Sequence, residues 1–161
     1  MPQYIGIDPG LKGGWVALDE HGAIKEKAPM PVCGDEVDTD ALLRCLAGNP
    51  IRSICIERQQ AFPKQGVSST FLTGLNYGLL RGALKAAYSL QIISAKEWQA
   101  EMLKGKPRGD ETKASALQVA KELWPAIDWR KTERCKVAHD GMVDAVLIAE
   151  YGRRKTECLL R

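Results

Sequence analysis

Two short apolar segments, each ending in an acidic residue, constrain the fold of this chain most strongly. Residues 3–8 read QYIGID and stop before a Pro-Gly pair, and residues 51–57 read IRSICIE. Short β-branched runs bounded by turn residues are typical of buried strands in an α/β sheet. We therefore expect two central strands with Asp8 and Glu57 at their carboxyl ends. Open α/β sheets bind their ligands at this edge.

The rest of the chain predicts a hairpin followed by helices. Residues 13–30 contain two apolar stretches around Glu20-His21-Gly22, which is typical of a β-hairpin. A further short strand is expected at residues 91–94. The expected helices are at residues 39–48, at 71–90, around Trp98, at 110–124 and at 139–154. This order is that of a ribonuclease H-like α/β fold, with a mixed five-stranded sheet flanked by helices.

Two of these helices carry more specific predictions. The expected buried stripe of the first helix consists of Ala41, Leu42, Cys45 and Leu46. In the long second helix, Gly74, Gly78 and Gly82 recur every four residues and leave one flank without side chains. Each interior glycine costs about 0.5 to 1 kcal/mol relative to alanine, so we expect very close packing on this flank. Its partner is either the sheet or a second copy of the chain.

The segment AHDGMVDAVLIA at residues 138–149 supplies two further acids, Asp140 and Asp144. Residues four apart share one face of a helix, and the apolar residues that follow are expected to hold the helix against the sheet. Capping of the helix N-terminus explains Asp140 well, but it explains Asp144, one turn further in, poorly. We expect Gly141 to leave room beside the acids for a metal ion, a water molecule or a phosphate.

Four converging carboxylates repel one another unless cations lie between them. Clusters of oxygen ligands suit Mg²⁺ or Mn²⁺. Two such ions activate a water molecule and stabilise the leaving oxygen of a phosphodiester. Asp8, Glu57, Asp140 and Asp144 therefore predict a metal-dependent nuclease with two ions in its active site.

Composition and charge are consistent with this prediction. The 161 residues are expected to form a single domain, 1–161, in the cytoplasm, with no membrane span and with five reduced, structural cysteines. The net charge is only +3, but basic residues cluster around positions 104–113, 130–136 and 153–155. Such clusters bind phosphates, although a solvated cationic surface explains them equally well.

Several segments together resemble the RuvC-type Holliday junction resolvases, and above all their phage and chloroplast members. The match runs from Tyr4 to about Gly152 and rests on IGIDPG, SICIERQQAFPKQG, ISAKEWQAEML, KASALQVAKELWP and HDGMVDAVLIAEYG. The resemblance implies a crossover junction endodeoxyribonuclease, a homodimer that cuts opposed strands of a four-way DNA junction with divalent metal at the four acids. Bacterial members have their last two acids three residues apart, where this chain has Gly141. If Asp140 does not reach the metal, Asp8, Glu57 and Asp144 remain the core, with His139 as a weaker candidate.

The resemblance also places DNA contacts on the loops around the acids. Phe62 and Phe71 are expected to wedge or stack against bases, with core packing as the alternative for one of them, and Lys113 and Lys136 to lie near the scissile phosphate or the DNA backbone. The remaining expected DNA-binding residues are Lys64, Lys104, Lys106, Arg108, Arg130, Lys131 and Arg134.

Two other functions remain open. The same fold acts on another nucleic acid, such as an RNA–DNA hybrid or branched DNA, or the chain is a DNA-binding module whose acids are structural. GIDPG also occurs in sugar-kinase and actin-like folds, but this chain is too short for their two-lobed ATP site.

Overall fold

A mixed five-stranded sheet forms the centre of the computed structural model, which describes residues 1–61 and 63–159. Its strands are β1 (Gln3–Asp8), β2 (Gly14–Leu18), β3 (Ile24–Pro29), β6 (Ile51–Glu57) and β7 (Leu90–Ile93). Their order is β3-β2-β1-β6-β7. The first three strands pair antiparallel, and β6 and β7 extend the sheet in parallel with β1. The predicted fold class, a mixed five-stranded sheet flanked by helices, is thereby confirmed.

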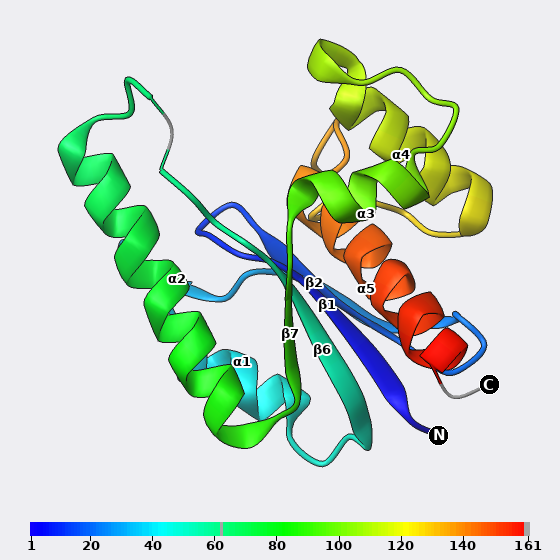
Figure 1. Ribbon diagram of the computed structural model, residues 1–161, viewed down its shortest axis with the longest axis horizontal. Helices are drawn as coiled ribbons and strands as arrows, with labels where there is room; N and C mark the ends of the chain where they lie inside the picture. The colour runs from blue at the N-terminus through cyan, green and yellow to red at the C-terminus, as the bar shows by residue number, and fades with distance from the viewer. Residues whose placement is uncertain (62, 160–161) are drawn as a thin grey trace.

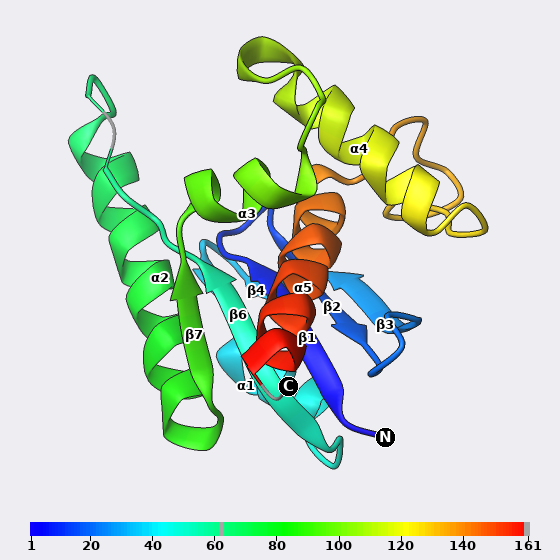
Figure 2. The same ribbon diagram turned by 45° about the vertical axis from the view of Figure 1, so that its right-hand side comes forward.

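Helices cover both faces of this sheet (Figures 1 and 2). They are α1 (Thr39–Leu46), α2 (Val67–Ala87), α3 (Ala95–Met102), α4 (Thr112–Leu123) and α5 (Asp140–Leu159), with a 3₁₀ turn at Gly109–Glu111. Helices α1 and α2 pack on one face, and α3, α4 and α5 belong to the core of the other. Side-chain alternation divides the strands between these cores. Ile5 and Ile7 of β1 join the α1–α2 side, whereas Cys55 of β6 joins the α5 side.

Helix α5 lies on β1 and β2 at backbone distance (Figure 2). A Cβ atom at Gly6 of β1 would lie 2.1 Å from the carbonyl oxygen of Ala145 and 2.3 Å from the backbone nitrogen of Ala149. At Gly152, a Cβ would lie 2.3 Å from Sγ of Cys55. The missing side chains therefore set how closely α5 approaches the sheet.

A small hairpin, β4 (Val32–Cys33) with β5 (Glu36–Val37), was not predicted from the sequence. Two-residue strands are too short to show a periodic pattern. The buried Asn76 of α2 holds this hairpin: its Oδ1 accepts a hydrogen bond from the Val37 backbone nitrogen at 2.7 Å, and its Nδ2 donates to the Asp35 carbonyl at 3.1 Å.

Three predictions about the helices need correction. Helix α2 begins four residues earlier than expected, at Val67, and ends three residues earlier, at Ala87, whereas α5 continues five residues further than expected, to Leu159. Cys45 is exposed, because α1 buries mainly Leu42 and Leu46.

The glycine flank of α2, formed by Gly74, Gly78 and Gly82, does not pack against the sheet. A Cβ atom at any of the three would meet no atom within 4 Å. Instead, the flank lines a shallow groove of about 500 Å³ together with Thr39, Leu75, Leu79 and Ala83. The prediction of close packing against the sheet is therefore wrong, and a second copy of the chain remains as the predicted partner.

All five cysteines are free thiols, but the prediction that they are structural fails for Cys33, Cys45 and Cys158, which are exposed, and only Cys55 is buried. Among the described helices, none has both the length and the apolar character needed to cross a membrane.

Candidate functional site

Asp8 and Glu57 end two neighbouring parallel strands. The register that pairs Ile7 with Ile56 places the two acids side by side at the next position. Because side chains alternate along a strand, Glu57 points to the same face as Cys55, which is the face covered by α5. Both acids are partly buried there.

Helix α5 brings the other two acids to this edge. Its first turn meets the β1–β2 turn through a backbone bridge between Gly13 and Gly141. Asp140 and Asp144 follow on one helix face, with Asp140 exposed and Asp144 partly buried. We refer to Asp8, Glu57, Asp140 and Asp144 as the acid cluster.

Gly141 has a packing role that was not predicted. A Cβ atom at this position would lie 2.5 Å from the carbonyl carbon of Gly13 and 2.6 Å from the Lys12 carbonyl oxygen. Gly141 therefore permits close contact between α5 and the β1–β2 turn, and it also borders the cavity beside the acids.

A cavity of about 790 Å³ opens beside the acid cluster. Asp8, Asp140 and Asp144 line one side of it with Lys113, and Asn76 and Tyr77 of α2 line another. Glu57 is not part of the lining. The structure thus places three of the four predicted acids at an open cleft and the fourth behind them.

Burial and the charges of neighbouring acids raise the pKa values of Asp8 and Asp144. Burial is the main cause at Asp144, and the negative charges of Glu57 and Asp140 add to it, so that its pKa rises to about 7. At Asp8, burial followed by the charges of Asp144, Glu57 and Asp140 holds the pKa well above its usual range. Lys113 opposes both shifts. Concentrated, poorly solvated negative charge is typical of functional sites.

Glu57 has a partner that the sequence did not reveal. Nε1 of the fully buried Trp98 donates a hydrogen bond to its Oε2 at 2.6 Å. Burial raises the pKa of Glu57, and this hydrogen bond lowers it. Trp98 comes from α3, 41 positions away in the chain.

Asp140 is also engaged. Nζ of Lys113 donates to its Oδ2 at 2.6 Å, and both side chains are largely exposed. Within residues 1–61 and 63–159, no group of three or more His, Cys, Asp or Glu side chains is arranged so that it could hold a metal ion. Glu57 and Asp140 are instead held by Trp98 and Lys113.

His139, the weaker candidate, acts within the helix start. Its Nδ1 accepts a hydrogen bond from the backbone nitrogen of Met142 at 3.3 Å, and its own backbone nitrogen donates to the Trp129 carbonyl at 2.7 Å. Burial lowers its pKa. These contacts give His139 a role in capping α5.

The predicted DNA-binding residues differ in how they are held. Phe71 is 68% exposed, so core packing is ruled out for it, while Phe62 lies outside the described residues. Lys106 pairs with Glu122 and Arg130 with Asp128, each at 2.7 Å. The residues that are exposed and outside the salt bridges found in the described chain are Lys64, Lys104, Arg108, Lys131, Arg134 and Lys136.

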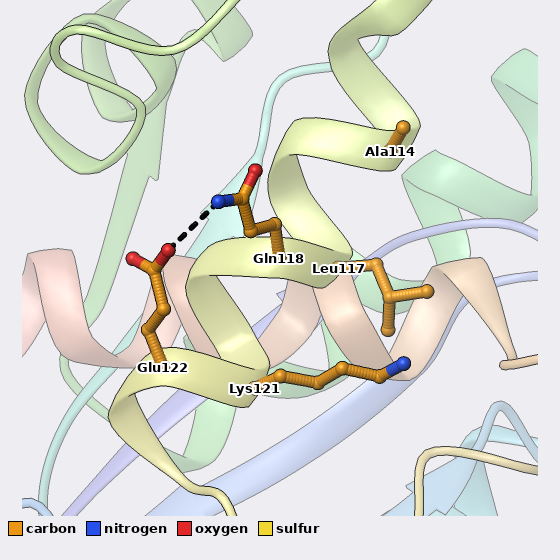
Figure 3. A pocket seen from close by; sticks show the side chains of 5 residues that line it. All are labelled: Ala114, Leu117, Gln118, Lys121 and Glu122. Carbon is orange, nitrogen blue, oxygen red and sulfur yellow. Dashed lines mark hydrogen bonds between the residues drawn. The ribbon is translucent and has the colours of Figure 1, made fainter.

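A second depression, of about 430 Å³, lies on α4 (Figure 3). Its lining comes from one helix face, where Nε2 of Gln118 donates to Oε1 of Glu122 at 2.9 Å. It shares no residue with the cavity beside the acid cluster.

Three solved structures share the architecture of this chain. Thermus thermophilus RuvC in complex with a Holliday junction substrate matches with a TM-score of 0.69 and 14% identity, over 98% of this chain and 96% of that one. The fold is that of the RuvC-type resolvases. A second T. thermophilus RuvC structure matches the RuvC fold of this chain with a TM-score of 0.61 and 16% identity, over 96% and 95% of the two chains.

The yeast mitochondrial Holliday junction resolvase Ydc2 has the RuvC fold as well. It matches with a TM-score of 0.62 and 19% identity, over 97% of this chain and 79% of that one. No protein-family model and no curated protein sequence matches this chain. The ribonuclease H-like architecture predicted from the element order is therefore confirmed at the level of the RuvC fold.

Proposed function

We propose that the protein is a structure-selective endonuclease that resolves four-way DNA junctions by divalent-metal-dependent hydrolysis of phosphodiester bonds. The observation that carries the proposal is the acid cluster, in which Asp8 and Asp144 sit poorly solvated beside a large open cavity. Support also comes from the shared fold, since one of the matching structures is a RuvC bound to a Holliday junction substrate.

The donor set suits Mg²⁺ or Mn²⁺ in ligand type, and its side chains would have to draw together to hold two such ions. All four side chains offer carboxylate oxygens, which these cations prefer, and the raised pKa values of Asp8 and Asp144 mark uncompensated negative charge. When bound, the ions would supply an activated water and neutralise charge at the leaving oxygen. Oδ2 of Asp140 accepts the Lys113 hydrogen bond, so a metal ion at that oxygen would displace the lysine.

Lys113 then gains a second role. Its ammonium group lies at the cavity beside the acids, where a scissile phosphate would arrive. We propose that Lys113 moves from Asp140 to the phosphate when metal and DNA bind. The exposed basic residues of the 104–108 and 130–136 loops bind the DNA backbone.

The protein is proposed to act as a homodimer. Two cleavages at opposed strands require two acid clusters, and the glycine flank of α2 is an open surface on which a second helix can approach closely. Exposed apolar residues of the same helix, Val67 and Leu79, support this assignment.

The test is cleavage of a labelled synthetic four-way junction by the wild-type protein and by Asp144→Asn, with Mg²⁺ and with EDTA. We expect paired nicks that need both the metal and Asp144, with a loss of more than about 100-fold in the variant, since even outer-shell partners of metals cost 10- to 100-fold. Matched duplex, branched and RNA–DNA hybrid substrates separate the alternative nuclease functions. Junction binding without any metal-dependent cleavage would indicate a DNA-binding module.

A further inference from the structure

Trp98 is the residue near the acid cluster whose position the proposed function does not explain. Its indole ring is fully buried, and its Nε1 lies 2.6 Å from Oε2 of Glu57. An indole N–H only donates, so it is matched to a carboxylate that accepts. Short hydrogen bonds to an ionised acceptor are about twice as strong as neutral ones.

The helix that carries Trp98 is fixed at its N-terminal end. Helix α3 starts directly after β7, whose Ile93 pairs with Glu57 in the sheet. Ser94 caps the helix, because its Oγ accepts a hydrogen bond from the Glu97 backbone nitrogen at 3.2 Å, while Oε2 of Glu97 accepts from the Ser94 backbone nitrogen at 2.8 Å. The indole therefore reaches Glu57 from a rigid position.

We propose that Trp98 is a positioning residue that holds the Glu57 carboxylate by one oxygen and so fixes its orientation toward the bound metal ions. Without this donor, Glu57 is a long side chain that must be ordered when the metal binds. Groups that orient metal ligands from behind typically change metal affinity or activity by about 10- to 100-fold. The inference rests on the proposed metal-dependent function.

The chain offers a matched control. Trp129 is also buried, at 2% exposure, but its Nε1 has no hydrogen-bond partner in the described part of the chain. Trp98→Phe and Trp129→Phe therefore remove the same atoms from a buried site, and only the first removes a hydrogen bond to the acid cluster.

The experiment measures cleavage kinetics on the four-way junction and Mn²⁺ binding by calorimetry for both variants and the wild type. We expect Trp98→Phe to lower kcat and the Mn²⁺ affinity by about 10-fold or more with an unchanged KM for the junction. Trp129→Phe should leave kcat and Mn²⁺ affinity unchanged. Equal effects of the two variants, or wild-type Mn²⁺ affinity in Trp98→Phe, would overturn the inference.

A second variant keeps the inference testable if Trp98→Phe does not fold. Replacing Trp98 by benzothienylalanine keeps the bicyclic shape and exchanges the N–H for sulfur, so the same losses are expected in a folded protein. If the wild type binds Mn²⁺ but cleaves no junction, the proposed function fails while the Mn²⁺ comparison still decides the role of Trp98. A wild type that binds no Mn²⁺ contradicts both.

Discussion

Asp144 shows at the scale of one residue how the fold concentrates charge. Its position, four residues after Asp140 and within an apolar helix, already distinguished it from a capping residue. The structure adds that burial and the neighbouring acids raise its pKa to about 7.

This shift predicts how stability depends on pH in the metal-free protein. In the unfolded chain Asp144 has its ordinary pKa of 3.8, so between about pH 4 and pH 7 the folded state binds more protons than the unfolded state. The free energy of unfolding therefore falls as pH rises through this window and levels off above it. Asp8 and Glu57, whose pKa values are also raised, act in the same direction.

Urea unfolding in EDTA at about pH 5 and pH 8 measures this effect. Asp144→Asn should be less sensitive to pH than the wild type and more stable than it at the higher pH. Asp128→Asn is the control, because Arg130 holds the pKa of Asp128 at about 2, below the window. An unchanged pH dependence in Asp144→Asn would contradict the prediction.

The sequence predicted the acids but not the residues that hold two of them. Asp8 and Glu57 follow from apolar runs that end in an acid, which is a local pattern. Trp98 is 41 positions from Glu57, and Lys113 is 27 positions from Asp140, so only the packing of α3 and α4 brings them close. Lys113 was assigned to a phosphate, and its bond to Asp140 was not foreseen.

At the scale of elements, the glycines of β1 and α2 differ in how closely other atoms approach them. The sequence alone does not show which atoms, if any, lie against Gly6 and Gly78. In the structure Gly6 touches the backbone of α5, whereas Gly78 faces open space. Helix order and type were predictable from periodicity, and the facing of the glycine flank was not.

Alanine substitutions separate these two cases. Gly6→Ala forces a Cβ into the backbone of Ala145 and Ala149, so we expect a loss of about 1 to 3 kcal/mol or more in the free energy of unfolding. Gly78→Ala adds a methyl group without a clash in an exposed helix, so we expect a gain of about 0.5 to 1 kcal/mol for the monomer. Chemical denaturation at low protein concentration measures both.

The dimer gives the second substitution another readout. If a second copy packs on the glycine flank, Gly78→Ala also weakens association in sedimentation equilibrium. A variant that is more stable and associates as the wild type does would place the dimer contact elsewhere.

At the scale of the whole molecule, the structure distinguishes basic residues that form internal ion pairs from those that are exposed. Arg153 and Arg154 were part of a predicted basic cluster, but both bind the buried Glu150, at 2.8 and 2.7 Å. These two arginines therefore form ion pairs within α5. Those on the 130–136 loop at Lys131, Arg134 and Lys136 remain exposed.

The salt dependence of junction binding tests which of these basic residues contact DNA phosphates. Each phosphate contact contributes about 0.9 to the slope of log K against log salt for duplex DNA. We expect the double variant Lys131→Ala/Lys136→Ala to reduce the slope by about two, and Lys106→Ala, whose charge already binds Glu122, to change it little. Fluorescence anisotropy in EDTA avoids cleavage during the titration. Equal reductions from the paired and unpaired lysines would count against the assigned DNA-binding surface.

The contact of α5 with β1 has a consequence for protein synthesis. Asp8 is synthesised well before Asp140 and Asp144, which complete the cleft to which it belongs. Since synthesis runs from the N-terminus, an incomplete polypeptide that stops before α5 carries only half of the acid cluster. A nascent or truncated chain without α5 is therefore expected to lack the proposed activity, which would appear only once α5 has been made and docked on the sheet.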